Sequence, residues 1–161
     1  ENKYRTYSLF PVGRLDIDTE GLLILTNDGI LTHNLLAPNK HVDKKYYVEL
    51  KYPVTEEVVE KLEAGIELEK DFITKNAKVE IIENSEEPIN KKTGERNPSK
   101  AYITISEGKY HQVKRMFKAV DNKVEYLKRI QMGSLKLDEK LKIGEYRELT
   151  EKELETLKNG K

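Results

Sequence analysis

Apolar residues recur along this chain with helical spacing in four segments. In the clearest of them, four apolar residues fall at positions i, i+3, i+4 and i+7 and therefore share one helix face. They are Val113, Met116, Phe117 and Val120. The last segment begins with the sequence T-E-K-E, which is a capping box. We predict helices over residues 30–36, from 55 to about 65, over 110–120 and from 150 onward.

Shorter apolar segments, rich in β-branched and aromatic residues, are interspersed with these helices, as is typical of strands. We predict strands over residues 7–12, 21–26, 44–52, 77–82, 101–106, 124–132 and 135–137. The sequence Asn27-Asp28-Gly29 marks a turn after the second of them. Residues 84–100 contain turn formers, charges and two prolines, so we expect an exposed connection between two strands there.

This order of elements predicts the fold class. Helices and strands are interspersed, and some strands are adjacent in sequence. An α+β fold with a mixed, mostly antiparallel sheet and flanking helices fits this order better than a doubly wound parallel sheet does. A length of 161 residues is typical of one domain, so we expect residues 1–161 to form a single domain.

The net charge of the chain gives no sign of nucleic-acid binding, but its distribution is uneven. The 29 Lys and Arg residues balance 29 Asp and Glu residues, so the strong positive charge typical of nucleic-acid-binding domains is absent. Residues 109–129 nevertheless carry a local excess of basic residues, and residues 56–95 a local excess of acidic ones. We therefore expect one basic working face and an acidic surface elsewhere.

Several kinds of chemistry lack the residues that they need. There is no cysteine, which excludes disulfides and thiolate metal sites and suits a reducing cytoplasm. No apolar stretch has transmembrane length. The three histidines lack metal-ligand spacing, and phosphate-binding glycine loops and a G-x-S-x-G elbow are absent. We expect no metal, no cofactor and no membrane partner.

A small set of polar residues remains as candidates for chemistry. Asp16 lies in a glycine-flanked turn, close to Asp18 and Glu20. Tyr46 lies on a predicted strand, and Lys114 borders the apolar stripe of a basic helix. An aspartate in a turn commonly bonds its own backbone, a tyrosine on a strand is often core, and a basic helix face is often only solvated. The pattern by itself leaves the structural and the functional interpretation open.

Longer motifs in the chain resemble the RsuA-like branch of the RNA pseudouridine synthases. "GRLDIDTEGLLILTNDG" resembles the first signature of this family, "KKYYV" the second, and "EGKYHQVKRMF" the third. The segments "YLKRIQMGSLKLDE" and "LKIGEYRELTEKEL" resemble its C-terminal strands and closing helix. The motifs occur in the family's order and cover nearly the whole chain.

The resemblance implies a role for individual residues. Asp16 falls on the catalytic aspartate, whose attack on the base or on the sugar stays open, while Asp18 and Glu20 are left to shape the turn. Tyr46 falls on the tyrosine that stacks against the flipped base, and Lys114 on the basic residue that pairs with the aspartate. Many relatives have arginine there, so this chain keeps the charge but loses the bidentate fork. Arg14 falls on a residue that in related synthases helps extrude the target uridine. The residues expected to contact RNA are Arg14, Lys109, His111, Gln112, Arg115, Lys118, Lys128 and Arg129.

The resemblance also implies the reaction and the substrate. The enzyme would isomerise a uridine in ribosomal RNA to pseudouridine without cofactor. The C-terminal segments are more like those of the small-subunit group, so we expect 16S rRNA in a small-subunit assembly particle as the partner of a monomeric, cytoplasmic enzyme. The family's usual upstream RNA-binding module is not found in this sequence. The alternatives are a 23S-specific relative and a non-catalytic RNA-binding assembly factor.

Overall fold

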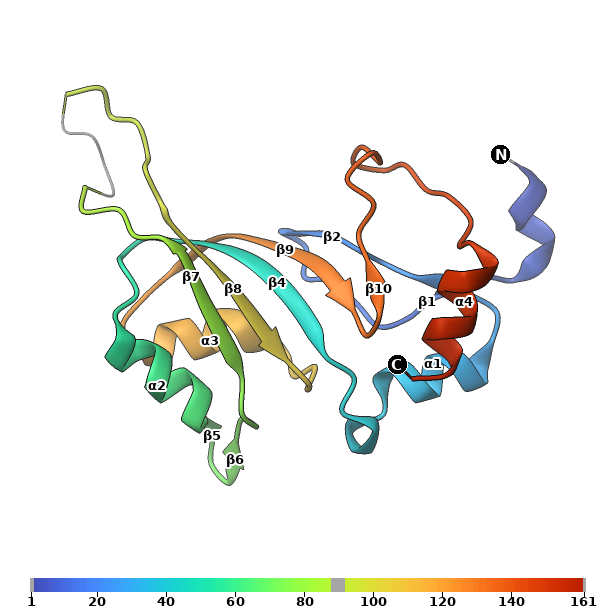
Figure 1. Cartoon of the computed structure of the whole chain (residues 1–161), viewed down its shortest axis with the longest axis horizontal. Coiled ribbons are helices and arrows are strands. Elements are labelled where there is room, and N and C mark those ends of the chain that lie inside the picture. The colour runs from blue at the N-terminus through green and yellow to red at the C-terminus, as the bar shows by residue number, and fades with distance from the viewer. Residues whose placement is uncertain (1, 88–91, 161) are drawn as a thin grey trace.

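A six-stranded mixed sheet forms the centre of the protein in a computed structural model that describes residues 2–87 and 92–160 (Figure 1). The strand order is β10-β9-β4-β8-β7, and β2 pairs with β9 in parallel while the other pairs are antiparallel. This arrangement confirms the predicted α+β class. The strands are β2 (Thr19–Gly21), β4 (Lys44–Leu50), β7 (Lys78–Glu83), β8 (Ser99–Ile105), β9 (Val124–Met132) and β10 (Leu135–Lys136).

Four α-helices, two 3-10 helices and two two-stranded sheets make up the remaining regular structure of the described residues. The helices are η1 (Asn2–Tyr7), α1 (Gly29–Leu36), η2 (Pro38–Lys40), α2 (Glu56–Ala64), α3 (Gln112–Ala119) and α4 (Glu151–Lys158). The small sheets pair β1 (Phe10–Pro11) with β3 (Leu25–Thr26), and β5 (Glu67–Glu69) with β6 (Phe72–Ile73). Among the described helices, none combines the length and the apolar character needed to span a bilayer.

The larger hydrophobic core lies between the sheet and helices α2 and α3. Val48 and Leu50 of β4 and Ile103 of β8 are fully buried, and they belong to one cluster with Leu62 of α2 and Phe117 of α3. The two helices lie on the same side of the sheet (Figure 1). The periodicity of α3 predicted this packing, because its apolar face is the one that is buried.

A second core lies beside α1, β10 and α4. Val12, Leu31, Leu35 and Leu157 are buried there together with Met132 at the end of β9. Strand β9 supplies Leu127 to the larger core, so this one strand belongs to both cores. Residues of both hydrophobic cores therefore hold in place the strand with which β2 pairs.

Several predicted element boundaries are wrong. The segment 7–12 forms a strand only at Phe10–Pro11. The segment 21–26 divides between two sheets, because the Leu22 N–H donates to Arg129 of β9 at 2.8 Å while the Ile24 carbonyl accepts from Val12 at 2.8 Å.

Helix α2 ends at Ala64, in agreement with the predicted end near residue 65, and Gly65 after it adopts a φ of +107°. The 3-10 helix η1 and the β5–β6 hairpin were not predicted. Residues 84–100 connect β7 to β8 as expected, although residues 88–91 of this connection lie outside the described part.

Candidate active site

Asp16 lies in a turn that leads into β2. Its carbonyl oxygen accepts a hydrogen bond from the N–H of Thr19 at 2.9 Å, and Gly21 at the end of β2 is paired with Arg129 of β9. Gly21 has a φ of +107°, and a Cβ atom there would lie 2.1 Å from the Arg129 carbonyl oxygen. Glycine is therefore needed for β2 to lie this close to β9, and this pairing fixes the turn that carries Asp16.

Helix α3 supplies the cation of the site. Its apolar face is buried against the sheet. Its first turn is held by Gln112, whose side-chain amide donates to the buried Glu107 carboxylate and whose Oε1 accepts from the N–H of Lys109 at 3.0 Å. With the helix held in this way, Lys114 extends from the border of the apolar face toward Asp16.

The ammonium of Lys114 lies between two carboxylates of the turn. Its Nζ is 3.2 Å from Oδ2 of Asp16, and it also donates a hydrogen bond to Oδ1 of Asp18. On the other side, Nε2 of His111 lies 3.7 Å from Oδ1 of Asp16. The side chains of Asp16 and Lys114 are each about one quarter exposed, so this charged cluster lies at a partly buried position that a substrate can reach.

These contacts change the pKa values of two of the groups. Partial burial lowers the pKa of Lys114, but the hydrogen bonds to Asp18 and Asp16 outweigh that effect, so the pKa is raised overall. The hydrogen bond from Lys114 lowers the pKa of Asp18. Lys114 therefore stays charged throughout the neutral range, and Asp18 acts as a second anionic partner rather than only as a turn residue.

Tyr46 lies on the same side of the sheet as this cluster. It is paired with Arg129 across β4 and β9, and it packs against the larger core. Burial raises the pKa of the Tyr46 hydroxyl, the neighbouring Arg129 guanidinium opposes the rise, and the negative charge of Asp16 adds to it. The structure thus brings Asp16, Lys114 and Tyr46 into one electrostatic environment.

Arg129 and Gln112 do not lie on the surface, where RNA contacts were expected. Arg129 is only 2% exposed, and its Nε donates to the carbonyl of Leu22 at 2.9 Å, while its Nη2 is buried without a partner among the described residues. Gln112 is 3% exposed and supports α3. The sequence contained a signal for Arg129, because Leu127 lies two residues earlier and strand alternation places both on one face.

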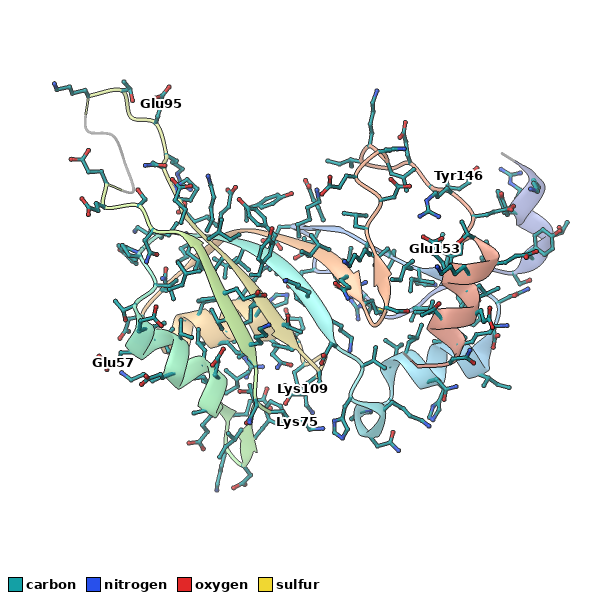
Figure 2. All side chains as sticks on the ribbon, viewed as in Figure 1. Glu57, Lys75, Glu95, Lys109, Tyr146 and Glu153 are labelled. Carbon is teal, nitrogen blue, oxygen red and sulfur yellow. The ribbon has the colours of Figure 1, made fainter. Side chains whose placement is uncertain are left out.

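The other residues expected to contact RNA differ in whether their basic groups already have a partner within the protein. Arg115 pairs with Glu69 at 2.8 Å and donates to the Leu68 carbonyl at 2.9 Å, so its guanidinium holds β5 against α3. Lys109 (Figure 2) lies over the ring of Phe72 at 4.7 Å. Arg14 and Lys118 are exposed and make no ion pair within the described ranges.

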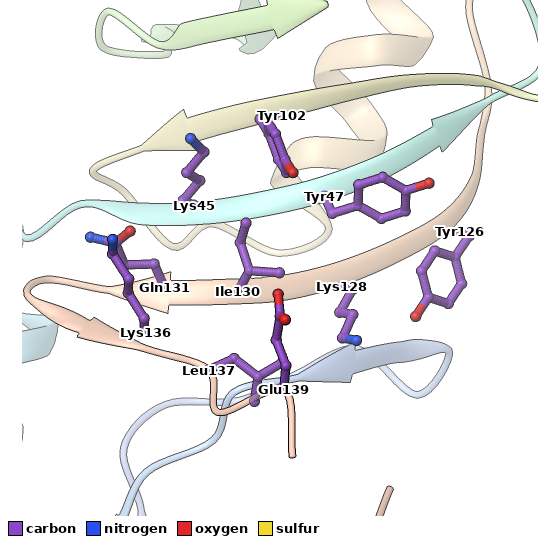
Figure 3. Close-up of a pocket in the computed structure, with 10 residues that line it drawn as sticks. All are labelled: Lys45, Tyr47, Tyr102, Tyr126, Lys128, Ile130, Gln131, Lys136, Leu137 and Glu139. Atoms are coloured by element: carbon purple, nitrogen blue, oxygen red, sulfur yellow. The ribbon is translucent and has the colours of Figure 1, made fainter. Parts of the chain in front are cut away.

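A surface hollow lies on the opposite face of the sheet. It has a volume of about 420 Å³, and its lining includes Tyr47 and Tyr126 (Figure 3). Lys128 also lines it, and is paired with Tyr47 just as Arg129 is paired with Tyr46, so strand alternation directs these two pairs to opposite faces. Lys128 therefore lies away from Asp16.

Two tyrosine hydroxyls of this hollow are bound to carboxylates. The Tyr47 hydroxyl donates to Glu49 at 3.0 Å and the Tyr126 hydroxyl to Glu20 at 2.8 Å. Burial and these carboxylates raise the pKa of each tyrosine to about 12, so both hydroxyls stay protonated. The chemistry of the site thus lies on the α3 side of the sheet.

Known proteins are similar to this chain in sequence. The family model described as RNA pseudouridylate synthase matches residues 1–119. The "Uncharacterized RNA pseudouridine synthase YtzG" of Bacillus subtilis is 53% identical over 148 residues, which cover 92% of this chain and 58% of that protein. The "Ribosomal small subunit pseudouridine synthase A" of Escherichia coli K12 is 43% identical over 150 residues, again 92% of this chain and 58% of the relative.

Solved structures agree with the sequence comparison. A crystal structure of a pseudouridylate synthase superimposes with a TM-score of 0.81 at 43% identity, covering 92% of this chain and 59% of that one. The archaeal box H/ACA sRNP Nop10–Cbf5 complex matches with a TM-score of 0.57 at 18% identity, covering 85% of this chain and 43% of that one, which supports the fold alone. The chain spans a little under three fifths of the length of the curated relatives given above.

Two independent lines of evidence therefore lead to one family. The first is the set of sequence motifs, and the second is the fold that brings their polar residues together around Asp16. The family model and the relatives confirm the resemblance found in the sequence. The chain belongs to the RNA pseudouridine synthase family.

Proposed function

We propose that this chain isomerises a uridine of 16S ribosomal RNA to pseudouridine, with Asp16 as the catalytic carboxylate. The observation that carries the proposal is the placement of Asp16 in a glycine-fixed turn, 3.2 Å from the Lys114 ammonium and within electrostatic reach of the partly buried Tyr46. A carboxylate held by one cation and still one quarter exposed is both oriented and accessible to a nucleotide.

The residues present suit an isomerisation. The bond between C1′ of the ribose and N1 of the uracil breaks, the base turns, and a bond between C1′ and C5 of the uracil forms. The proton on C5 leaves, and N1 gains one, so the product has the composition of the substrate. A carboxylate can assist by forming a covalent intermediate, and Lys114 supports it by holding Asp16 in one orientation.

The uridine must leave its base stack before it can reach Asp16. Unstacking a base costs about a few kcal/mol, and stacking on an aromatic side chain returns about 1–3 kcal/mol per base. We assign this second role to Tyr46, whose partly buried ring packs against the larger core and whose hydroxyl is within electrostatic reach of Asp16. In this proposal the tyrosine offsets much of the cost of flipping.

Two findings support 16S rRNA as the substrate and the small-subunit assembly particle as the partner. Relatives from Escherichia coli and Salmonella typhimurium, 43% and 44% identical, are named for the ribosomal small subunit. The C-terminal segments of the chain also resemble that group. We also propose that the enzyme acts in the cytoplasm, and we predict that it is a monomer.

The experiment that tests this function is the mapping of pseudouridine in ribosomal RNA. Unmodified 16S and 23S rRNA would be incubated separately with the purified chain, and pseudouridine would be located by chemical derivatisation and primer extension. We expect one new pseudouridine in 16S rRNA and none in 23S rRNA. A product only in 23S rRNA would overturn the substrate assignment. Binding of RNA without product in either would favour a non-catalytic assembly factor.

A further inference from the structure

Ile17 is the most exposed large apolar residue of the described chain, and it follows Asp16 directly. This residue has a solvent-accessible surface that is 104% of the reference value for a fully exposed isoleucine. It occupies the first corner of the turn that the hydrogen bond from the Thr19 N–H to the Asp16 carbonyl closes. Turn corners favour Gly, Pro, Asn, Asp and Ser. An isoleucine there gains nothing from the turn, and its full exposure shows that it gains no burial.

The turn that carries Ile17 is braced on both sides. Lys114 contacts the carboxylates of the two residues that flank it, Asp16 and Asp18. Just after the turn, β2 is paired with β9 in the glycine-dependent contact. Isoleucine is β-branched and therefore stiff at χ1. The protein thus presents a rigid aliphatic side chain at a fixed place beside its reactive carboxylate.

Exposure alone does not mark a functional residue, because isolated apolar side chains are common on protein surfaces. Ile143 is 83% exposed and Ile30 is 78% exposed. These two residues lie between β10 and α4 and at the start of α1, respectively, and neither adjoins a residue of the charged cluster. The distinguishing feature of Ile17 is its position next to Asp16, on a turn that is held from both sides.

We propose that Ile17 is an apolar wedge that enters the RNA base stack beside the target uridine and keeps the vacated space open. This inference rests on the proposed function. Proteins that distort nucleic acids insert aliphatic side chains such as Leu, Ile and Met between base steps, which unstacks them. A wedge one residue from Asp16 unstacks the bases at the point where the uridine must leave. It acts on the neighbours of the uridine, whereas Asp16 and Tyr46 act on the uridine itself.

The test measures unstacking without turnover. A hairpin containing the uridine identified by the mapping would carry 2-aminopurine as its 3′ neighbour, and its fluorescence rises when that base unstacks. A saturating concentration of the Asp16→Asn chain should raise the fluorescence. The double variant, with both Asp16→Asn and Ile17→Asn, should lose most of that rise. Asparagine suits a turn corner, so this variant should fold. An Asp16→Asn chain that carries Ile17→Leu should retain the fluorescence rise. An Asp16→Asn chain that carries Ile143→Asn should show the same rise as Asp16→Asn alone.

Turnover gives a second, independent measurement. With Asp16 intact, Ile17→Asn should slow pseudouridine formation in the hairpin about tenfold, which corresponds to about 1.4 kcal/mol. The rate on a single strand of the same sequence should change less than twofold. An equal fluorescence rise with and without Ile17→Asn, or no rise with any variant, would overturn the wedge. A wedge signal in a hairpin whose uridine the mapping places in 23S rRNA would overturn the proposed 16S substrate and leave the wedge standing.

Discussion

At the scale of single residues, Lys114 connects the turn to α3. Its ammonium contacts Asp16 and Asp18 together, so removing it leaves two neighbouring carboxylates without their shared cation. The motif resemblance predicted the pairing with Asp16. It did not predict the contact with Asp18, because this contact depends on how the turn folds back toward α3, and two acids at positions i and i+2 give no local sign of it.

We predict that Lys114→Met lowers kcat about 100-fold, a loss typical of removing one preorganised electrostatic contact. Lys114→Arg keeps the charge and should retain most activity. Because the pKa of Lys114 is raised above its usual 10.5, the charge is present at all pH values below that. Deprotonation of Lys114 should therefore not limit the rate of the wild-type chain between pH 6 and 9. Rates of pseudouridine formation at several pH values test this, and equal kcat for Met and Lys would contradict it.

The role of Tyr46 depends on its ring. Tyr46→Phe keeps the aromatic surface and should retain most activity, whereas Tyr46→Ala should lose about 1–3 kcal/mol of stacking, or roughly 5-fold to 150-fold in kcat/KM. Single-turnover kinetics on the target RNA give the rates of both variants. Equal rates for the tyrosine, phenylalanine and alanine forms would remove stacking as the role of this residue.

At the scale of elements, the pairing of β2 with β9 decides where the turn lies. The sequence predicted one strand over 21–26, whereas the chain changes partner inside it, because Leu22 bonds β9 and Ile24 bonds Val12. An apolar run does not reveal such a change, since both halves are equally hydrophobic. The helical elements were predicted better, because the 3.6-residue period of α3 and the capping box at Thr150 are local signals that the structure contains.

Gly21→Ala tests the importance of this pairing. A Cβ atom would meet the Arg129 carbonyl oxygen at 2.1 Å, and the φ of +107° is strained for alanine. We expect a loss of about 1–3 kcal/mol in the free energy of unfolding, measured by urea denaturation. Gly29→Ala is the matched control, because nothing lies within 4 Å of a Cβ there. Equal midpoints for the two variants would show that β2 does not need glycine.

Helix α4 should be sensitive to acid through its N-terminal contacts. Arg147 pairs with Glu153 (Figure 2) at 2.8 Å, and this contact together with the bond from the Thr150 N–H lowers the pKa of Glu153 to about 2. A lowered carboxyl pKa contributes stability that is complete above the ordinary value of 4.5 and is lost as the pH falls toward 2. Glu153→Gln should lower Tm at pH 7 and reduce the difference in Tm between pH 5 and pH 3. An unchanged difference would contradict this.

At the scale of the whole molecule, the net charge is zero, but basic and acidic residues are concentrated in different segments of the chain. The sequence could predict a basic segment at 109–129, and α3 from this segment carries the active-site cation. It could not separate lysines that face RNA from those that do not. Lys128 lies on the opposite face, Arg115 pairs with Glu69, and Arg129 is buried. These placements depend on contacts between segments far apart in the chain, which no local pattern records.

Lys118 therefore becomes the sharpest test of the RNA surface on α3. It is exposed on the same helix as Lys114 and free of ion pairs within the described residues. Lys118→Ala should weaken RNA binding and reduce the slope of log K against log salt concentration by about one unit. Lys152→Ala, an exposed lysine on α4, should leave the slope unchanged. Equal slopes for all three chains would place Lys118 away from the RNA.

The most direct test of the whole account is the pseudouridine yield of Asp16→Asn beside that of Asp18→Asn. Both substitutions remove one carboxylate that contacts Lys114, and both keep the size of the side chain. Pseudouridine would be quantified in 16S rRNA by mass spectrometry after equal incubation with each folded chain. The account predicts no product with Asp16→Asn, unchanged RNA affinity, and substantial product with Asp18→Asn. Turnover by the Asp16→Asn chain would contradict the assignment of Asp16 as the catalytic carboxylate.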